Sequence, residues 1–322
     1  MSLSFACWGY DRTEALRSGD VAIEGFDVEL LSPDHRDIFD KMGSEQAFSA
    51  AEFSFCETVM HHASGNSPFV AIPAFMSKVF RHSFIYVNRG AGIKSPKDLE
   101  GKRVGVPLYT MTAALWQRGL LSDEYGVDCS TIKWVQGNLN GTGPHGNPTK
   151  IPPLLKPVDL EYSPDKSLND RLIDGEIDAV MGAQTPIGKD HPAVGRLFPE
   201  FRAVERDYYV RTGLFPIMHL VAIRKDVHAD NPGFAQALYN ALNKSKSAAL
   251  HKLGHTGANC VMMPFLAADL EEINGVFGGD PYCYGIEANR KTLETQIRYM
   301  VEQDYIAEAI PVEDIFLPVK EP

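Results

Sequence analysis

Short apolar runs that read as β-strands alternate with helical segments along the first half of the chain. Helical runs such as DIFDKMG and CETVMHHASG separate the strand-like runs LSFACW, FDVELLS, FSAAEFSF, FVAIPAF and SFIYVN. This alternation is typical of α/β domains, in which helices pack on the faces of a sheet. The last third of the chain is mostly helical and contributes too few strands for a third sheet. We therefore predict an α/β fold.

A turn-rich connector, IKSPKDLEGKRVGVP, opens a second α/β unit in the middle of the chain. Strands at the start of the chain and helices at its end would complete a larger unit around it. The sequence therefore predicts two lobes. Lobe I comprises residues 1–92 together with 206–322, and the inserted lobe II comprises residues 93–205.

Two crossing segments, near residues 86–89 and 204–209, would join these lobes. In such a layout a ligand binds between the lobes, at the carboxyl ends of strands and the amino ends of helices. Backbone N–H groups and hydroxyls at a helix start can donate hydrogen bonds to a bound carboxylate. The candidate residues at these ends are Tyr109, Thr110 and Thr112 at a helix start, and Gln184 and Thr185 at a strand end.

The composition narrows the function classes. The 322-residue chain is 44% hydrophobic and has no apolar run near the roughly 18 residues that a membrane span needs. Its start, MSLSFACWGYDRT, has neither a basic leader nor a long apolar stretch, and its five cysteines are scattered without a CxxC pair. We therefore expect a cytoplasmic protein with reduced thiols and no membrane partner.

The net charge of −11 comes from 42 acidic and 31 basic residues, and no basic run is interleaved with aromatic residues. Nucleic acid is therefore not an expected partner. An anionic small molecule is still an expected ligand. Local cations determine what binds in a closed cleft, because salt screens the field of the protein's net charge beyond about 10 Å.

Two distant stretches each combine an arginine with a histidine. Arg81 and His82 stand directly before the strand-like run SFIYVN, and the stretch RTGLFPIMH holds Arg211 and His219. Such charges could mark a solvated strand end, or they could face a cleft that receives an anion. The repeated pairing favours the second interpretation.

Two further polar residues are candidates for the same cleft. Arg12 follows the end of the first predicted strand. Glu52 lies inside the apolar run FSAAEFSF, where an ionised carboxylate is costly unless it is paired. We expect Glu52 to be a polar partner in the cleft rather than a solvent-facing side chain.

Two patterns that suggest a cofactor or a metal are misleading. GTGPHG matches the GxGxxG pattern, but the neighbouring prolines prevent the helix that a dinucleotide-binding loop must open. His251 and His255 have the i, i+4 spacing of a metal pair but no suitably placed carboxylate. We predict neither a cofactor nor a metal.

The chain resembles the 4,5-dihydroxyphthalate decarboxylases. This family consists of enzymes that break down aromatic acids and have a type II periplasmic-binding-protein-like fold. The stretches that carry the resemblance are CWGYDRT, AEFSFC, FRHSFIYVN, DLEGKRVGVPLYTMTAALWQRGLLSDEYGV, DGEIDAVMGAQTP, RLFP, RTGLFPIMHLVAIR and YGIEANRKTLE. They cover the chain nearly from end to end, whereas the Gly- and Pro-rich segment 137–157 matches poorly. The resemblance implies a two-lobed fold with a ligand cleft between the lobes and no cofactor.

The resemblance also implies a reaction, the removal of one of two adjacent carboxylates from a catechol ring to give protocatechuate and CO2. A hydroxyl para to the leaving carboxylate would push electrons into the ring, so that the ring carbon takes up a proton before CO2 leaves. His82 is then the first candidate for the general acid and His219 the second, while Glu52 would accept a hydrogen bond from a ring hydroxyl. The candidates for holding the dianionic substrate are Arg12, Arg81 and Arg211.

An alternative function belongs to another class. The same cleft could serve a solute-binding protein for an aromatic or other organic anion, without chemistry. An export leader would favour that interpretation, and the start of the sequence tilts our expectation toward an enzyme.

Overall fold

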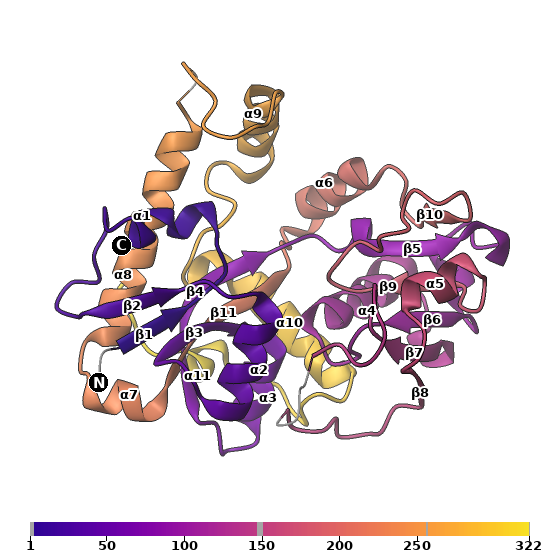
Figure 1. Cartoon of the computed structure of the whole chain (residues 1–322), viewed down its shortest axis with the longest axis horizontal. Helices are drawn as coiled ribbons and strands as arrows, with labels where there is room; N and C mark the ends of the chain where they lie inside the picture. Colours follow the sequence, from indigo (N-terminus) through magenta and orange to yellow (C-terminus); the bar gives the residue numbers. More distant parts are fainter. Residues whose placement is uncertain (1–2, 147–150, 256, 322) are drawn as a thin grey trace.

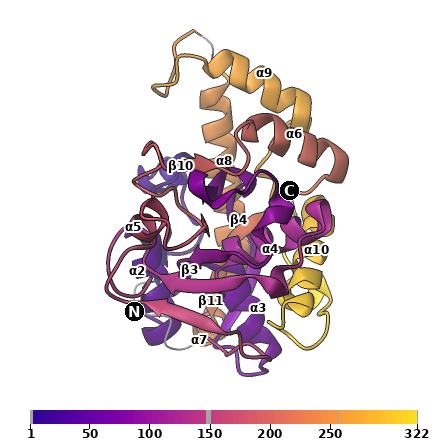
Figure 2. The ribbon, with the colours of Figure 1, turned by 90° about the vertical axis from the view of Figure 1, so that its right-hand side faces the viewer.

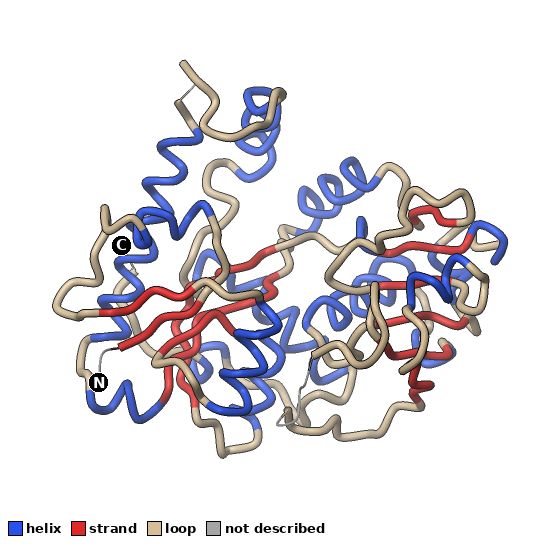
Figure 3. The backbone as a smooth tube through the Cα atoms, viewed as in Figure 1, coloured by secondary structure: helices blue, strands red, loops and turns tan. Residues whose placement is uncertain are grey.

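The structure of the chain is a computed structural model that describes residues 3–146, 151–255 and 257–321. Two β-sheets form its framework, one in each of two lobes that lie side by side (Figure 1). Helices flank both sheets (Figure 3). The predicted two-lobed α/β architecture is confirmed.

The sheet of the first lobe has the strand order β2-β1-β3-β11-β4. β1 is parallel to both β2 and β3, whereas β11 runs antiparallel between β3 and β4. All five residues of β3 are buried, as expected for a central strand covered on both faces. The strands are β1 (Leu3–Ala6), β2 (Val28–Leu31), β3 (Ala50–Ser54), β4 (Phe69–Lys78) and β11 (Ile217–Arg224). The helices of this lobe are α1 (Glu14–Arg17), α2 (His35–Glu45), α3 (Phe55–Ala63), α7 (Lys225–Asp230), α8 (Phe234–Leu253), α9 (Leu266–Phe277), α10 (Arg290–Glu302) and α11 (Val312–Ile315).

The sheet of the second lobe has the order β10-β5-β9-β6-β7-β8. β6 is parallel to β7 and β9, and the antiparallel strands β5 and β10 lie at one edge. Gly105 permits close packing here, because a Cβ at this position would lie 2.8 Å from the Ile177 side chain. The strands are β5 (Ile85–Asn88), β6 (Arg103–Val106), β7 (Lys133–Gly137), β8 (Leu160–Ser163), β9 (Ala179–Met181) and β10 (Val194–Arg196). The helices are α4 (Thr112–Tyr125), α5 (Leu168–Ile173) and α6 (Phe201–Thr212).

The chain crosses between the lobes earlier than the sequence suggests. β5, which the prediction assigned to lobe I with the rest of residues 1–92, pairs with β9 and β10 in the second sheet. The first crossing is therefore the segment between Lys78 and Ile85, rather than residues 86–89, and the return passes through α6 into β11. The sequence could not place β5, because its hydrogen-bonding partners lie about a hundred residues further along the chain.

Helices α4 and α10 pack against each other where the lobes meet, and Figure 2 shows them side by side. Gly119 of α4 makes room for the ring of Tyr299 on α10. Arg118 Nε donates to Gln303 Oε1 at 2.8 Å, and its Nη2 donates to Tyr305 Oη at 2.7 Å. The C-terminal part of the chain therefore ties the second lobe to the first.

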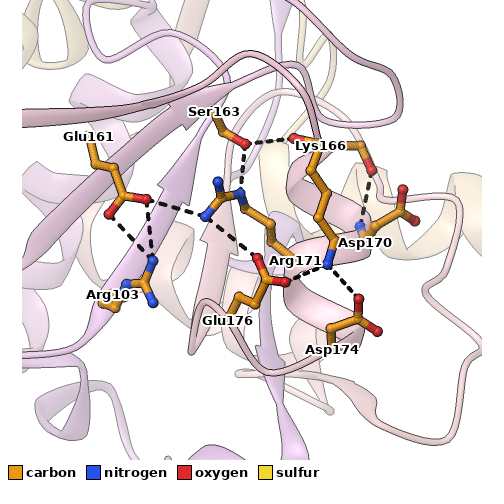
Figure 4. A network of polar contacts seen from close by, with 9 residues as sticks. Arg103, Glu161, Ser163, Lys166, Asp170, Arg171, Asp174 and Glu176 are labelled. Atoms are coloured by element: carbon orange, nitrogen blue, oxygen red, sulfur yellow. Dashed lines mark hydrogen bonds and ion pairs between the residues drawn. The ribbon is translucent and has the colours of Figure 1, made fainter.

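Polar contacts reinforce the outer side of the second lobe (Figure 4). Arg171 of α5 lies between Glu161 of β8 and Glu176, and its Nε donates to Ser163 Oγ at 2.7 Å. These groups are structural, because none of them lines the cavity described below. Within the described part of the chain, no helix has both the length and the apolar character needed to cross a membrane.

Candidate functional site

A cavity of about 430 Å³ lies between the two lobes. The first lobe contributes side chains from α2, β3, α3, β4 and β11, together with the segment after β1. The second lobe contributes the start of α4, the residues after β9 and one residue of the loop after β7. The cleft predicted between the lobes therefore exists, with walls from both lobes.

Glu52 lies directly behind one wall of this cavity and is fully buried. Its Oε2 accepts a hydrogen bond from the Trp8 backbone N–H at 3.0 Å, and its Oε1 accepts one from Tyr10 Oη at 2.6 Å. His219 Nδ1 lies 2.6 Å from the same Oε1. This convergence follows from the sheet order, because β3 lies between β1 and β11. Glu52 is thus a paired carboxylate and not a solvent-facing side chain, but it does not itself line the cavity as the sequence suggested.

The protonation states of Glu52 and His219 follow from these contacts. Burial alone would raise the pKa of Glu52, but the contacts with His219 and with His35, whose Nε2 lies 3.5 Å from Oε1, outweigh it and hold this pKa below its ordinary value. Burial lowers the pKa of His219, against the opposing effect of Glu52. A neutral His219 therefore donates from Nδ1 to the carboxylate and keeps a lone pair on Nε2. Because His219 lines the cavity, it is suited to accept a proton from a ligand.

Sequence analysis missed two members of this group, Tyr10 and His35. Tyr10 Oη lies 2.9 Å from His35 Nε2 and bridges this ring to Glu52. Both residues line the cavity. Tyr10 lies within the WGYDRT stretch, which also carries the family resemblance, but His35 is the first residue of an ordinary helix and gives no sequence signal of its role.

The group also has the chemistry of a metal site, which the sequence did not predict. His35, Glu52 and His219 each offer one ligand atom, and these atoms lie within 4.8 Å of one another. Two imidazoles and a carboxylate could hold a divalent transition metal. In this structure the same atoms are engaged in hydrogen bonds with one another and with Tyr10, so a metal would have to displace those bonds.

Arg81 supplies positive charge to the cavity. Its side chain comes from the segment between β4 and β5, and the residue is only 4% exposed. Nε contacts Met218 Sδ at 3.1 Å, and Nη1 donates to the Ala183 carbonyl at 3.4 Å. Arg81 forms no ion pair with any described carboxylate, and burial lowers its pKa to about 9 despite the opposing charge of Glu205. A buried cation on a cavity wall, without a carboxylate partner among the described residues, is suited to binding an anionic ligand.

The loop after β7 reaches across to the first lobe at the mouth of the cavity. His145 lines the cavity together with Arg36 of α2. A side chain at Gly146, where φ is +73°, would collide with the Arg36 side chain, so the loop backbone lies directly against α2. Arg36 also pairs with Asp40 at 2.6 Å. Part of the 137–157 segment that matches the resembled family poorly is therefore part of the cavity wall.

The structure brings only some of the predicted residues to the cavity. Arg81, Thr112, Gln184 and His219 line it, and Glu52 lies behind His219. Thr112 Oγ1 also accepts a hydrogen bond from the Cys56 backbone N–H at 3.2 Å, which ties the starts of α3 and α4 together.

His82, the first candidate for the general acid, lies elsewhere. It is 1% exposed and is not among the described residues that line the cavity. Its ring packs against Tyr125, Phe198 and Tyr208, with centroid distances of 5.1 to 6.3 Å. Both ring nitrogens are buried without a described hydrogen-bond partner, and burial together with the Arg211 charge lowers the pKa of His82 to about 4. The assignment of His82 to the cavity is wrong, because its neighbours are aromatic core residues.

Two of the three predicted arginines are also outside the cavity lining. Arg211 is about half exposed and pairs with Asp207 at 2.8 Å and Glu124 at 2.6 Å. Arg12 lies behind Tyr10, with its guanidinium 3.7 Å from the ring centroid, and donates to the Met76 carbonyl. Each guanidinium is therefore engaged within the protein, and Arg81 alone of the three faces the cavity.

The remaining predicted residues form the surroundings of the site. Tyr109 is buried under the Arg118 guanidinium, 3.8 Å from its ring centroid, and its carbonyl accepts a hydrogen bond from Tyr305 Oη. Tyr86 Oη donates to Thr185 Oγ1 at 3.5 Å. Three predicted residues are not among the described residues that line the cavity, namely Tyr109, Thr110 and Thr185.

Comparison with known proteins gives three findings. Residues 22–144 match the family model described as NMT1/THI5 like. The 4,5-dihydroxyphthalate decarboxylase of Comamonas testosteroni is 37% identical over 306 residues, which cover 91% of this chain and 89% of that protein. The protein of the same name from Pseudomonas putida is 35% identical and covers 65% of this chain and 81% of its own length.

Solved structures resemble this fold with little sequence similarity. The periplasmic aliphatic sulphonate binding protein SsuA of Escherichia coli has a TM-score of 0.53 and 10% identity, covering 98% of this chain and 97% of its own. The desulfurization enzyme DSZB also has a TM-score of 0.53, with 13% identity and coverage of 98% and 96%. The predicted periplasmic-binding-protein-like fold is confirmed.

Proposed function

The chain belongs to the 4,5-dihydroxyphthalate decarboxylase family, and from this membership we propose that it decarboxylates an aromatic dicarboxylate in the cavity between its lobes. One observation carries the proposal. Arg81, which is buried without a carboxylate partner in the described part of the chain, and His219, which is backed by Glu52, line the same cavity, so an anion-binding group and a proton-accepting group can meet one ligand. The proposed substrate is 4,5-dihydroxyphthalate, and the products are protocatechuate and CO2.

Arg81 is proposed to bind a carboxylate of the substrate. A charge-assisted hydrogen bond of this kind contributes about 1.5 to 3 kcal/mol. Thr112 at the start of α4 and Gln184 of the second lobe are proposed as further polar contacts to the ligand. Because these contacts come from both lobes, a bound dianion would hold the lobes together.

His219 is proposed to accept the proton of the ring hydroxyl that lies para to the leaving carboxylate. Glu52 acts through His219, because its own oxygens already accept hydrogen bonds from the protein and it is fully buried. The carboxylate fixes the imidazole orientation and stabilises the imidazolium that forms. The proposal differs from the sequence-based expectation, in which Glu52 itself contacts the ring hydroxyl and His219 is a candidate acid, because Glu52 does not line the cavity and His219 does.

The chemistry then follows from the hydroxyl. Loss of its proton to His219 pushes an electron pair into the ring, and the carbon that bears the carboxylate takes up a proton. The bond to the carboxylate breaks next, its electrons restore the aromatic ring, and CO2 leaves. His219 finally returns its proton to the hydroxyl oxygen. The sequence of steps needs no organic cofactor, because the para hydroxyl supplies the electrons.

We also propose a cytoplasmic location. All five cysteines are free, and free thiols are typical of a reducing compartment.

The test is to incubate the protein with 4,5-dihydroxyphthalate and to quantify CO2 and protocatechuate. We expect the two products in equal amounts, with turnover that saturates with substrate. A His219→Asn variant, which keeps a hydrogen bond but cannot accept the proton, should lose about 10²-fold or more in kcat. Saturable binding of the substrate to the wild-type protein without any product would support a solute-binding protein and refute the proposal.

A further inference from the structure

Glu57 is a buried carboxyl on the cavity wall that the proposed reaction has not used. It occupies the first turn of α3, lines the cavity and is 4% exposed. Only its backbone N–H has a described hydrogen-bond partner, the Oγ of Ser54 at 3.4 Å. Among the described residues, nothing donates a hydrogen bond to the Glu57 carboxyl or pairs with it. A buried carboxyl without a partner is costly to fold, and such groups concentrate at functional sites.

The electrostatic surroundings favour the neutral acid form of Glu57. Burial is the main effect and raises its pKa to about 7. Arg36 acts in the opposite direction, and Asp40 adds a negative charge that raises this pKa further. The charged or titratable groups on the elements around this cavity are Tyr10 after β1, His35, Arg36 and Asp40 on α2, Glu52 on β3, His145 in the loop after β7, Arg81 before β5, and His219 on β11.

The reaction lacks a proton donor once His82 is removed from the cavity. His219 is occupied with the hydroxyl proton in the proposed mechanism, and burial lowers the pKa of His145 to about 4, which leaves this ring mostly unprotonated. Tyr10 and His35 also line the cavity, but they are hydrogen-bonded to each other, and the Tyr10 hydroxyl donates to Glu52. Glu57 is the carboxyl that lines the same cavity among the described residues. We propose that Glu57 is the general acid that protonates the ring carbon, an inference that rests on the proposed function.

The step balances as follows. The O–H bond of Glu57 breaks and a C–H bond forms at the carbon that bears the leaving carboxylate, with the electron pair supplied by the deprotonated para hydroxyl. The bond from that carbon to the carboxylate then breaks, and CO2 departs. Glu57 is left as a carboxylate and takes one proton from water before the next turnover. Each cycle therefore consumes one solvent proton, as the conversion of a carboxylate to CO2 and a C–H bond requires.

The experiment compares three variants with the wild-type protein in the same decarboxylation assay. Glu57→Gln keeps the size and a hydrogen-bond donor but has no transferable proton, so kcat should fall about 10²-fold or more while substrate affinity changes by less than about threefold. Glu57→Asp keeps a titratable group one methylene further away and should retain intermediate activity. Glu308→Gln, an exposed position without a described contact, is the matched control and should match the wild type.

The pH dependence separates a proton donor from a structural residue. In the wild type, kcat/KM should fall as the pH rises through about 7, because Glu57 of the free enzyme loses its proton in this range. The fall in activity with rising pH should be absent from the residual activity of Glu57→Gln, and in Glu57→Asp it should occur at a different pH.

The possible outcomes separate this inference from the proposed function. Product from the wild type together with unchanged kcat in a folded Glu57→Gln variant would overturn the role of Glu57 and leave the decarboxylase function intact. Absence of product from the wild type would overturn both. Circular dichroism shows whether Glu57→Gln folds. If it does not fold, the pH profile of Glu57→Asp tests the proposal instead, and a profile identical to that of the wild type would contradict the role of Glu57.

Discussion

At the scale of single residues, Arg81 and Arg211 differ in how their charge is satisfied. Arg81 is buried in the cavity wall without a described carboxylate partner, whereas Arg211 is half exposed and pairs with Asp207 and Glu124. A ligand carboxylate would satisfy the charge of Arg81, while that of Arg211 is already satisfied by the protein. The two residues therefore form a matched pair for a binding experiment.

We expect Arg81→Gln to weaken substrate binding about 10- to 150-fold, the equivalent of one lost charge-assisted hydrogen bond. Arg211→Gln should leave affinity nearly unchanged, because its guanidinium is not among the described cavity-lining groups. Isothermal titration calorimetry with 4,5-dihydroxyphthalate measures both. Equal losses in the two variants would show that the effect of Arg81 is not local to the cavity.

His82→Phe should be tolerated and should stabilise the protein in acid. The pKa of His82 is lowered from 6.5 to about 4 in the folded state, so the unfolded chain binds more protons as the pH falls between these values. The folded state therefore loses stability over this range, and phenylalanine removes that loss while keeping a ring among the aromatic neighbours. Thermal unfolding at pH 5 and pH 8 should show a higher Tm for the variant at pH 5, with turnover retained. A folded His82→Phe variant without turnover would contradict this expectation and would indicate that His82 is the general acid.

These residues also show what the sequence could and could not predict. Each of the two predicted arginine–histidine pairs places one member at the cavity, Arg81 and His219, and the other member outside its lining. Glu52 is paired, because an ionisable residue in an apolar run demands a partner, but it lies behind the cavity wall. His82 follows Arg81 directly, and nothing in the sequence indicates that the two side chains point to different environments. The role of Glu57 was hidden as well, because an acidic residue in the first turn of a helix is ordinary.

At the scale of elements, helices α4 and α10 hold the lobes together through close packing. Gly119 of α4 faces the ring of Tyr299 on α10, and Tyr299 Oη in turn donates to Asp123 Oδ2 at 2.8 Å. The second lobe thus relies on helices from the end of the chain, a pairing that no local sequence pattern reveals. The strands were easier to predict, because their apolar runs are local, but the sheet that β5 joins depends on a distant partner.

Gly119→Ala should therefore destabilise the protein by about 1 to 3 kcal/mol, the usual cost of an overpacked contact. The added methyl group would overlap the Tyr299 ring. Gly275→Ala on α9 is the control, since an added Cβ meets nothing within 4 Å, and helix propensity should make it neutral or slightly stabilising. Urea unfolding monitored by fluorescence compares the two. Equal stability of both variants would contradict the close packing of α4 against α10.

At the scale of the whole molecule, the fold by itself does not decide the function. Both a sulphonate-binding protein and a desulfurization enzyme share this arrangement at TM-scores of 0.53. What distinguishes an enzyme on such a scaffold is the chemistry of its cavity. Here the cavity combines a buried arginine, a histidine backed by a buried carboxylate and a further buried carboxyl, and neither the arginine nor the further carboxyl has an ion-pair partner among the described residues. These groups come from segments that lie far apart in the sequence.

The central claim is that the chain decarboxylates its substrate by protonating the ring carbon that bears the leaving carboxylate. The most direct measurement is to run the reaction with 4,5-dihydroxyphthalate in heavy water and to locate deuterium in the product by proton NMR. The account predicts protocatechuate with one deuterium at the carbon that lost CO2, because the proton donor exchanges with solvent between turnovers. Protocatechuate without deuterium at that position would contradict the account.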